Sequence, residues 1–337
     1  MIRRKKTAMA LAAAAAVMIA VVGTAGCKRK IEPISKSGFM LNTFVTVTLY
    51  DNDDPDILNG SLELCRSYEN ILSRTIEESE IYRLNHRRPG EEAVTVSEDA
   101  AALLKRGLYY SELSEGAFDI TVEPLSSLWD FTSEIHNVPP AAEIEAAREK
   151  VDYRNMKVEN TEVKFASPDT TVDLGAIAKG YIADRMKDYL VEQGVKSAVI
   201  NLGGNVLCVG NKPDGTPFKV GLQKPYADRN ETIGTFRVSD MSVVSSGVYE
   251  RHFEKNGVNY HHLLDPRTGY PYHNGLVSVT IISDLSVDGD GLSTTCFSLG
   301  LEEGMKLIDS IEGAYGVFIT EDYQVHYSEG AKQFVEE

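Results

Sequence analysis

The chain has 337 residues, with 34 Lys and Arg against 50 Asp and Glu, and a formal net charge of −16 at pH 7. So acidic a chain repels nucleic acid and anionic lipid headgroups, which argues against nucleic-acid partners, and any phosphate site in it needs a local cation. Apart from Cys27 there are three cysteines, far apart and without a C-x-x-C pair, which argues against a disulfide framework or a zinc site and predicts buried apolar thiols.

The N-terminus has the pattern of an export signal. Residues 3–6 are cationic, residues 7–26 carry no charge, and two small residues stand directly before Cys27. This resembles a bacterial lipobox and predicts a signal peptide over 1–26, lipidation at Cys27 and a polar tether over 27–37. Thr24 stands where such boxes usually carry leucine, and the apolar stretch is long, so an uncleaved membrane anchor is the alternative.

Both interpretations place the remaining chain on the extracytoplasmic face of a bacterial membrane. Without residues 1–26 the chain loses four cations, which leaves 30 Lys and Arg against 50 Asp and Glu, a formal charge of −20. Residues 38–337 are then expected to form the functional domain.

The hydrophobic pattern of the first half predicts one strand followed by helices. Alternating apolar residues indicate a strand at 44–50, and helical spacing indicates helices at 57–72 and 80–85. Ser97 is the expected N-cap of a helix that continues to about residue 113 and ends before Gly116. A further helix is expected at 141–150.

The second half mixes strands with helices. Helices are expected at 177–191 and 293–311, and a β-type stretch at 197–209 is interrupted by Gly203-Gly204. The other expected strands are 218–222, 235–238, 243–244 and 277–282, with a closing hairpin of 315–320 and 323–327. Because these elements do not alternate strictly as βαβ units, the order favours an α+β fold over a doubly wound sheet.

The first of three unusual segments is TVDLGAIAKGY, residues 171–181. Asp173 follows a strand-like pair, Gly175 permits a tight turn, and a helix follows at once. Amide groups at a helix N-terminus favour phosphate, although the spacing is not that of a Walker A loop. An ordinary glycine turn before a capped helix is the alternative.

The second segment is HHLLDPRTGYP, residues 261–271. It holds two histidines, a cation and a hydroxyl around an Asp-Pro turn, and these side chains suit acid–base chemistry and phosphate binding. A β-turn with an incidental histidine pair is the alternative.

The third segment is DGDGLST, residues 288–294. Asp290 and Thr294 are four residues apart, so their oxygens can face one hard cation from a single helical turn, and magnesium prefers such ligands. If Asp284 is taken as the first residue of an EF-hand loop, the twelfth residue is Thr295 instead of glutamate, which argues against calcium. A solvated Asp-Gly turn is the remaining alternative.

Eight ordered motifs together resemble the ApbE-type FAD:protein FMN transferase family. They are MLNT (40–43), LSRTIEESEIYRLN (72–85), GAFDIT (116–121), VDLGAIAKGY (172–181), INLGGN (200–205), SSGVYER (245–251), HHLLDPRTGYP (261–271) and DGLST (290–294). The resemblance implies an α+β fold of mixed helices and largely antiparallel sheet, in two intimately joined subdomains with a central FAD cleft.

The resemblance also implies the chemistry. Magnesium would bridge the FAD pyrophosphate, a threonine hydroxyl of an acceptor protein would attack the FMN-side phosphorus, and AMP would leave. By position, the metal would be held by the backbone carbonyl of Ala176 and the side chains of Asp290 and Thr294. The acceptor would be a flavin-carrying subunit of a membrane redox complex or an extracytoplasmic flavoprotein.

The same resemblance assigns the remaining site residues. His262 would handle a proton or stabilise charge beside the reacting phosphate, and Thr268 would bind phosphate. His261 and Arg267 are open between functional and structural roles. The FAD contacts would be Met40, Ala117, Phe118, Asp119, Asp173, Lys179 and Leu264.

Two other functions remain possible from the sequence. A magnesium-dependent FAD pyrophosphatase would use the same site, with water as the nucleophile. A flavin-binding lipoprotein would bind flavin without cleaving it, and would not need the Asp290 and Thr294 pair beside His262.

Overall fold

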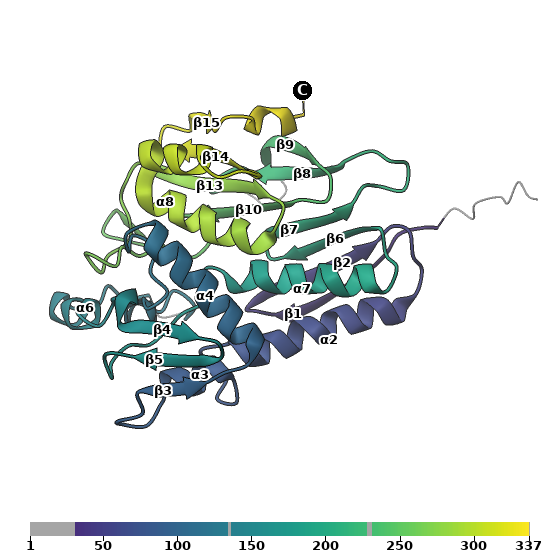
Figure 1. The fold of residues 1–337 in the computed structure, drawn as a ribbon. Coiled ribbons are helices and arrows are strands. Elements are labelled where there is room, and N and C mark those ends of the chain that lie inside the picture. Colours follow the sequence, from purple (N-terminus) through teal and green to yellow (C-terminus); the bar gives the residue numbers. More distant parts are fainter. Residues whose placement is uncertain (1–30, 134–135, 228–230, 337) are drawn as a thin grey trace, which may run out of the picture. The chain divides into compact units, whose positions relative to one another are not determined.

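An antiparallel sheet of eight strands forms the frame of the fold (Figure 1). The computed structural model describes residues 31–133, 136–227 and 231–336. In spatial order the strands are β1 (Ile34–Met40), β2 (Thr43–Leu49), β6 (Ser197–Leu202), β7 (Asn205–Gly210), β10 (Ser242–Gly247), β13 (Leu276–Ser283), β14 (Ala314–Thr320) and β15 (Val325–Tyr327). Every neighbouring pair in this order is antiparallel.

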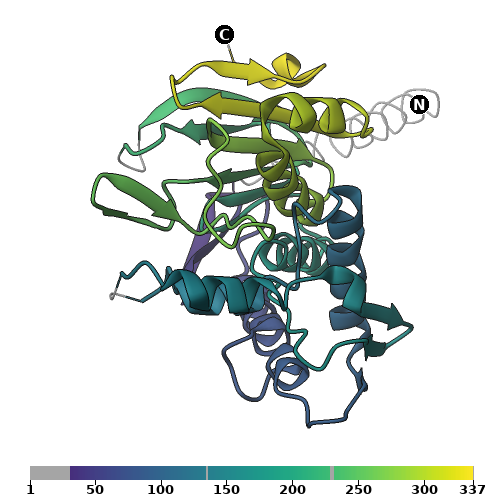
Figure 2. The same ribbon diagram turned by 90° about the vertical axis from the view of Figure 1, so that its left-hand side faces the viewer.

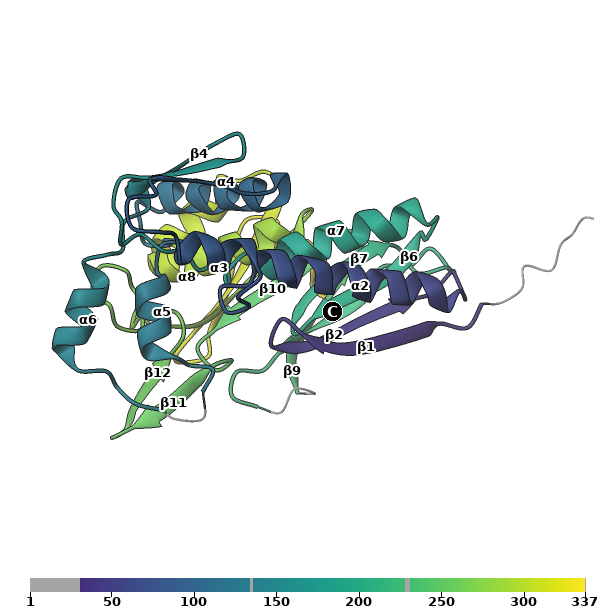
Figure 3. The ribbon, with the colours of Figure 1, turned by 90° about the horizontal axis from the view of Figure 1, so that it is seen from below.

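Three helices cover one face of this sheet. Viewed from below, α2 (Pro55–Leu72) and α7 (Ala178–Glu192) lie on the same side of β1 and β2 (Figure 3). The long helix α8 (Ser286–Asp309) packs on β10 and β13, and α4 (Glu98–Leu113) packs against α8. Apolar residues at helical spacing turn inward, as in Leu58, Leu62 and Cys65 of α2.

The opposite face of the sheet is covered in part by a hairpin of β8 (Phe218–Gln223) and β9 (Thr232–Val238). A second hairpin, of β11 (His252–Lys255) and β12 (Val258–His261), extends away from the sheet and is drawn in green in Figure 2. The other elements are α3 (Glu80–Asn85), β3 (Ala93–Thr95), α5 (Glu123–Trp129), α6 (Ala141–Arg148), η1 (Tyr153–Asn155), β4 (Met156–Glu159), β5 (Glu162–Phe165) and η2 (Ala331–Phe334).

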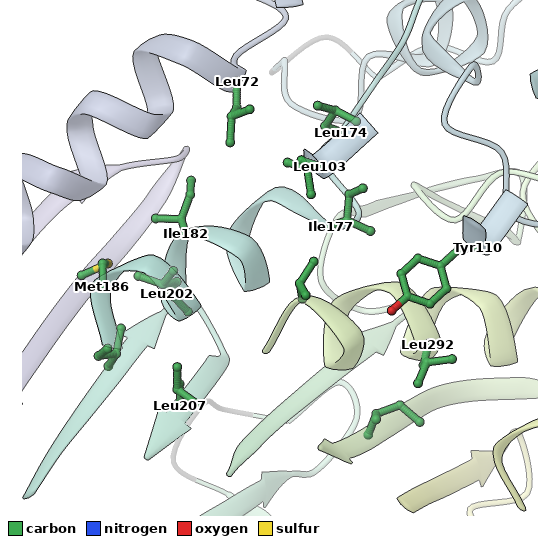
Figure 4. Close-up of a cluster of buried hydrophobic side chains, with 14 of the residues drawn as sticks. Leu72, Leu103, Tyr110, Leu174, Ile177, Ile182, Met186, Leu202, Leu207 and Leu292 are labelled. Atoms are coloured by element: carbon green, nitrogen blue, oxygen red, sulfur yellow. The ribbon is translucent and has the colours of Figure 1, made fainter. Parts of the chain in front are cut away.

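The largest hydrophobic cluster lies between the sheet and its helices. Figure 4 shows Ile182 and Met186 of α7 near Leu202 and Leu207 of the sheet, with Leu292 of α8 farther along the cluster. Residues Pro33–Glu337 form one compact unit, so the two expected subdomains are joined closely enough to count as one. Cys65, Cys208 and Cys296 are buried free thiols, as expected.

Most expected elements are confirmed, with boundaries shifted by a few residues. The α+β class and the largely antiparallel sheet are confirmed. The Ser97 side chain accepts a hydrogen bond from the Ala100 amide, as predicted for an N-cap. The expected β-type stretch at 197–209 is the hairpin of β6 and β7, which turns at Gly203 and Gly204.

Two expectations about element boundaries are wrong. The tether was expected over 27–37 and the domain from 38, but Ile34 already begins strand β1, because the whole strand pairs with β2. Helix α8 begins at Ser286 instead of 293, so Asp290 is buried within a helix and is not in a solvated turn.

The expected signal peptide and Cys27 lie outside the described residues, and within these residues no helix is long and apolar enough to cross a membrane.

Candidate active site

A cavity of about 980 Å³ opens where the sheet, α7, α8 and the loop after β12 meet. Its volume is at the upper end of the range for small-molecule sites. Ten of the residues that the sequence singled out line it: Ala117, Phe118, Asp119, Asp173, Ala176, Lys179, His262, Leu264, Asp290 and Thr294. The fold therefore brings together segments that are more than a hundred residues apart in the sequence.

Two predicted site residues are not in the cavity wall. Met40 is 4% exposed and belongs to the hydrophobic core, while its neighbours Leu41 and Asn42 line the cavity. Thr268 is exposed in the turn that follows Asp265, and its hydroxyl accepts a hydrogen bond from the Tyr270 amide. Thr268 is therefore outside the cavity wall in this structure, and its phosphate contact stays a prediction.

Asp290 presents a carboxylate in the cavity wall although it is only 4% exposed. Its Oδ1 accepts a hydrogen bond from the Asn205 side-chain amide at 3.0 Å, and its Oδ2 accepts one from the Gly180 backbone at 2.5 Å. Burial raises the pKa of this carboxyl, and the positive charge of Lys179 acts against that rise. The carboxylate is thus fixed in orientation and has one cation nearby.

Gly180 is the third residue of α7, where a backbone N–H has no carbonyl partner within the helix, and Asp290 supplies that partner. Ala176 lies just before α7 and also lines the cavity. A carboxylate, a carbonyl and the Thr294 hydroxyl are oxygen ligands of the kind that magnesium takes, with further positions open for water and phosphate.

The Thr294 hydroxyl lies one helical turn after Asp290. It shares a hydrogen bond of 3.1 Å with the Ser246 hydroxyl, which also bonds Ser293 at 2.8 Å. Within the described residues no group of three or more His, Cys, Asp or Glu is placed to hold a metal ion. A metal here would therefore depend on the hydroxyl and carbonyl oxygens as well as on Asp290.

His262 is half-buried in the wall formed by the loop after β12. Its backbone amide donates to the Arg251 carbonyl, and its Nδ1 has no hydrogen-bond partner within the protein. Burial lowers the pKa of His262 to about 3, and the positive charge of Arg251 acts in the same direction. The imidazole is therefore neutral near pH 7 and can accept a proton.

His261 and Arg267, whose roles the sequence left open, both make contacts within the fold. His261 is 2% exposed, and its Nε2 bonds the Tyr272 carbonyl at 2.9 Å. The Arg267 guanidinium pairs with Asp265 at 3.0 Å within the turn. Both residues hold the shape of the loop that carries His262.

Asp173 belongs to a network that the sequence did not reveal. Its Oδ2 pairs with the Arg74 guanidinium at 3.0 Å and accepts a hydrogen bond from the Ser126 hydroxyl at 2.7 Å. Its Oδ1 accepts the Gly175 amide at 2.8 Å, which fixes the turn before α7. The Asp119 carboxylate accepts hydrogen bonds from the Thr121 amide and hydroxyl and from the Tyr153 amide. It therefore stabilises the loop that carries Phe118.

Two functional residues were missed although both lie in motifs of the family resemblance. Asn205, in INLGGN, is 2% exposed and positions Asp290, and the Ser286 hydroxyl in turn holds its amide oxygen at 2.8 Å. Arg74, in LSRT, is a cation in the cavity wall of an acidic chain. The need for a local cation could have pointed to Arg74, whereas no local pattern marks Asn205.

These features define a class of protein: an α+β fold with a cavity walled by cations, a neutral histidine and groups that carry oxygen ligands. The ApbE family model matches residues 41–319, and the chain belongs to the ApbE family.

Relatives named FAD:protein FMN transferase cover most of the chain. One from Klebsiella pneumoniae (strain 342) is 38% identical over 86% of this chain and 90% of its own length. Another, from Treponema pallidum (strain Nichols), is 32% identical over 92% of this chain and 90% of its own length.

Solved structures agree with this membership. The ApbE protein of Thermotoga maritima matches with a TM-score of 0.82 and 32% identity, covering 91% of this chain and all of that one. The flavin transferase ApbE from Vibrio cholerae matches with a TM-score of 0.81 and 28% identity, covering 90% of this chain and 99% of that one.

Proposed function

We propose that this chain is an FAD:protein FMN transferase, which cleaves the pyrophosphate of FAD and attaches the FMN half to a threonine of an acceptor flavoprotein. The observation that carries the proposal is the meeting of Lys179, Asp290 and His262 in one cavity wall. The family match and the names of the relatives support the same reaction.

The residues of the cavity suit the reaction as follows. The threonine oxygen forms a bond to the FMN-side phosphorus, the bond from that phosphorus to the bridging oxygen breaks, and AMP leaves with that oxygen. Neutral His262 in the cavity wall accepts the hydroxyl proton; its low pKa keeps it unprotonated at neutral pH, although it also makes the imidazole a weak base before substrate binds. Lys179 supplies positive charge for the phosphate oxygens in an otherwise acidic protein.

Magnesium is part of the proposal. Asp290, Thr294 and the Ala176 carbonyl would hold the ion, and it would neutralise charge on the pyrophosphate. The fixed carboxylate of Asp290, in one cavity wall with Ala176 and Thr294, supports this ligand set.

The place of the protein in the cell is also a proposal. Export and lipidation at Cys27 would anchor the chain on the extracytoplasmic face of a membrane, where its acceptor would be a flavin-carrying membrane or extracytoplasmic protein. Replacement of Cys27 by serine should move the protein from the membrane fraction to the soluble fraction of cells. Unchanged membrane association would overturn lipid anchoring at this residue.

The reaction can be tested with protein that begins after Cys27, mixed with FAD, magnesium and peptides bearing one threonine between small residues. Peptide mass and AMP release would be followed together. A mass gain of one FMN, abolished by EDTA, is expected. AMP release without peptide modification would favour the pyrophosphatase, and bound but intact FAD would favour a flavin-binding protein.

A further inference from the structure

Two phenylalanines stand exposed on the hairpin at the rim of the cavity. Phe39 in β1 and Phe44 in β2 are 63% and 64% exposed, the highest values among the large apolar residues of the described chain. They are cross-strand partners, and their rings meet edge to face with centroids 5.5 Å apart. Apolar ring surface left in contact with water is unfavourable, and exposed aromatic side chains are typical anchors for a binding partner.

The hairpin that carries the pair is held rigidly beside the cavity. Its turn residues Leu41 and Asn42 have φ angles of +54° and +58°, a backbone form that is costly for leucine. The Leu41 amide donates to the Glu69 carboxylate of α2 at 2.6 Å, which holds the turn in this form. Leu41, Asn42 and Phe44 all line the cavity, so the aromatic pair borders the place where FAD is expected to react.

Strand β1 also offers an edge to a partner. It is the last strand of the sheet on this side, and among the described residues it pairs with β2 alone. Natural edge strands are commonly protected by charges or proline, but β1 carries one lysine, Lys36, and no proline. Residues 33–50 contain no acidic residue, in a chain with 50 of them, so this segment does not repel an acidic partner.

We propose that the edge of β1 and the Phe39–Phe44 pair dock the segment of the acceptor protein that carries the hydroxyl nucleophile. This inference rests on the proposed function. A hydroxyl on a folded protein reaches a phosphorus inside a cavity when its segment protrudes from the protein surface, and an extended segment meets this requirement. An extended segment along β1 would gain main-chain hydrogen bonds from the free edge, and its apolar side chains would cover the two rings. Its next residues would then enter the cavity past Leu41 and Asn42.

The test compares Phe39→Ser with Tyr323→Ser, using the peptide that the wild-type protein modifies. Phe39 does not line the cavity, and Tyr323 is an exposed aromatic residue, 52% exposed, in the turn between β14 and β15. For Phe39→Ser the KM for the peptide should rise about tenfold, with kcat, FAD affinity and melting temperature unchanged. Tyr323→Ser should leave all four values unchanged.

Three outcomes would overturn the docking surface. An unchanged peptide KM in Phe39→Ser would show that the rings do not contact the acceptor. A parallel loss of FAD affinity would assign Phe39 to the FAD site. A wild-type dimer that becomes monomeric in Phe39→Ser with an unchanged KM would assign the pair to self-association. If the wild-type protein modified no peptide, the transferase function itself would fail, which is distinct from all three.

Discussion

His262 enters the cavity as a neutral imidazole, because burial and the charge of Arg251 lower its pKa to about 3. It is therefore protonated only well below the pH of any normal assay. We predict that His262→Gln binds FAD normally and transfers FMN roughly 100-fold more slowly. FAD affinity from flavin fluorescence and kcat from AMP release separate the two effects. Equal losses of affinity and rate would make His262 a binding residue.

Single residues of the site were predictable where a motif holds the side chain in a defined turn or helix. Asp290 and Thr294 fall on one helical face, and that spacing is visible in the sequence. The positions of Thr268 and Met40 outside the cavity wall were not predictable, because which side of a turn or strand faces the cavity depends on tertiary packing. Asn205 was missed because its role depends on Asp290, 85 residues away.

The crossing of α7 and α8 depends on Gly180. A Cβ at this position would lie 2.2 Å from the Ser286 carbonyl oxygen, which is backbone and cannot move independently of α8. We predict that Gly180→Ala lowers the free energy of unfolding by about 1–3 kcal/mol. FAD cleavage should also fall, because the Gly180 amide would shift away from Asp290.

Thermal unfolding and AMP release check this prediction. Gly234→Ala in β9 is the matched control, since a Cβ there meets nothing within 4 Å. A Gly180→Ala protein as stable and active as the Gly234→Ala protein would show that the crossing tolerates a side chain.

Elements with strong internal patterns were predictable, and elements that depend on neighbours were not. The apolar spacing of α2 and the cap of α4 are properties of their own residues. Strand β1 is polar and is ordered by pairing with β2. The start of α8 contains Gly289 and Gly291, a pattern that is typical of a turn. In the fold, Gly291 makes room for the Tyr110 ring, because a Cβ at position 291 would lie 2.1 Å from a ring carbon of Tyr110.

The contribution of His261 to the stability of the whole molecule should fall as the pH is lowered from 6.5 toward 4. Burial lowers the pKa of His261 from 6.5 to about 4, so between these values the unfolded chain binds a proton that the folded chain does not. This contribution is fully present above pH 6.5 and is lost as the pH falls. From pH 7.5 to 5 it amounts to about 2 kcal/mol.

Asp184 acts in the opposite direction. Burial raises its pKa from 3.8 to about 6, so its contribution is lost as the pH rises between these values. Denaturant unfolding at pH 7.5 and pH 5 should therefore be compared between the wild-type protein and His261→Gln. The loss of stability at pH 5 should be about 2 kcal/mol smaller in the variant; an equal loss in both would mean that His261 does not contribute.

At the scale of the whole molecule, the sequence was sufficient for the α+β class and for the family, because eight motifs occur in order. It was not sufficient for strand order or for the cavity. The strands that line the cavity are separated by long segments, and their pairing, such as that of Val45 with Leu202, follows from packing over the whole chain.

Magnesium titration of Asp290→Ala shows whether this carboxylate anchors a magnesium-dependent cleavage of FAD. Asp284→Ala, an exposed carboxylate at the end of β13, is the control. Calorimetric magnesium binding and AMP release would be measured on folded protein. We expect Asp290→Ala to lose magnesium binding and about 100-fold or more of the AMP release, while Asp284→Ala keeps both. AMP release by Asp290→Ala near the wild-type rate at limiting magnesium would show that Asp290 does not hold the metal.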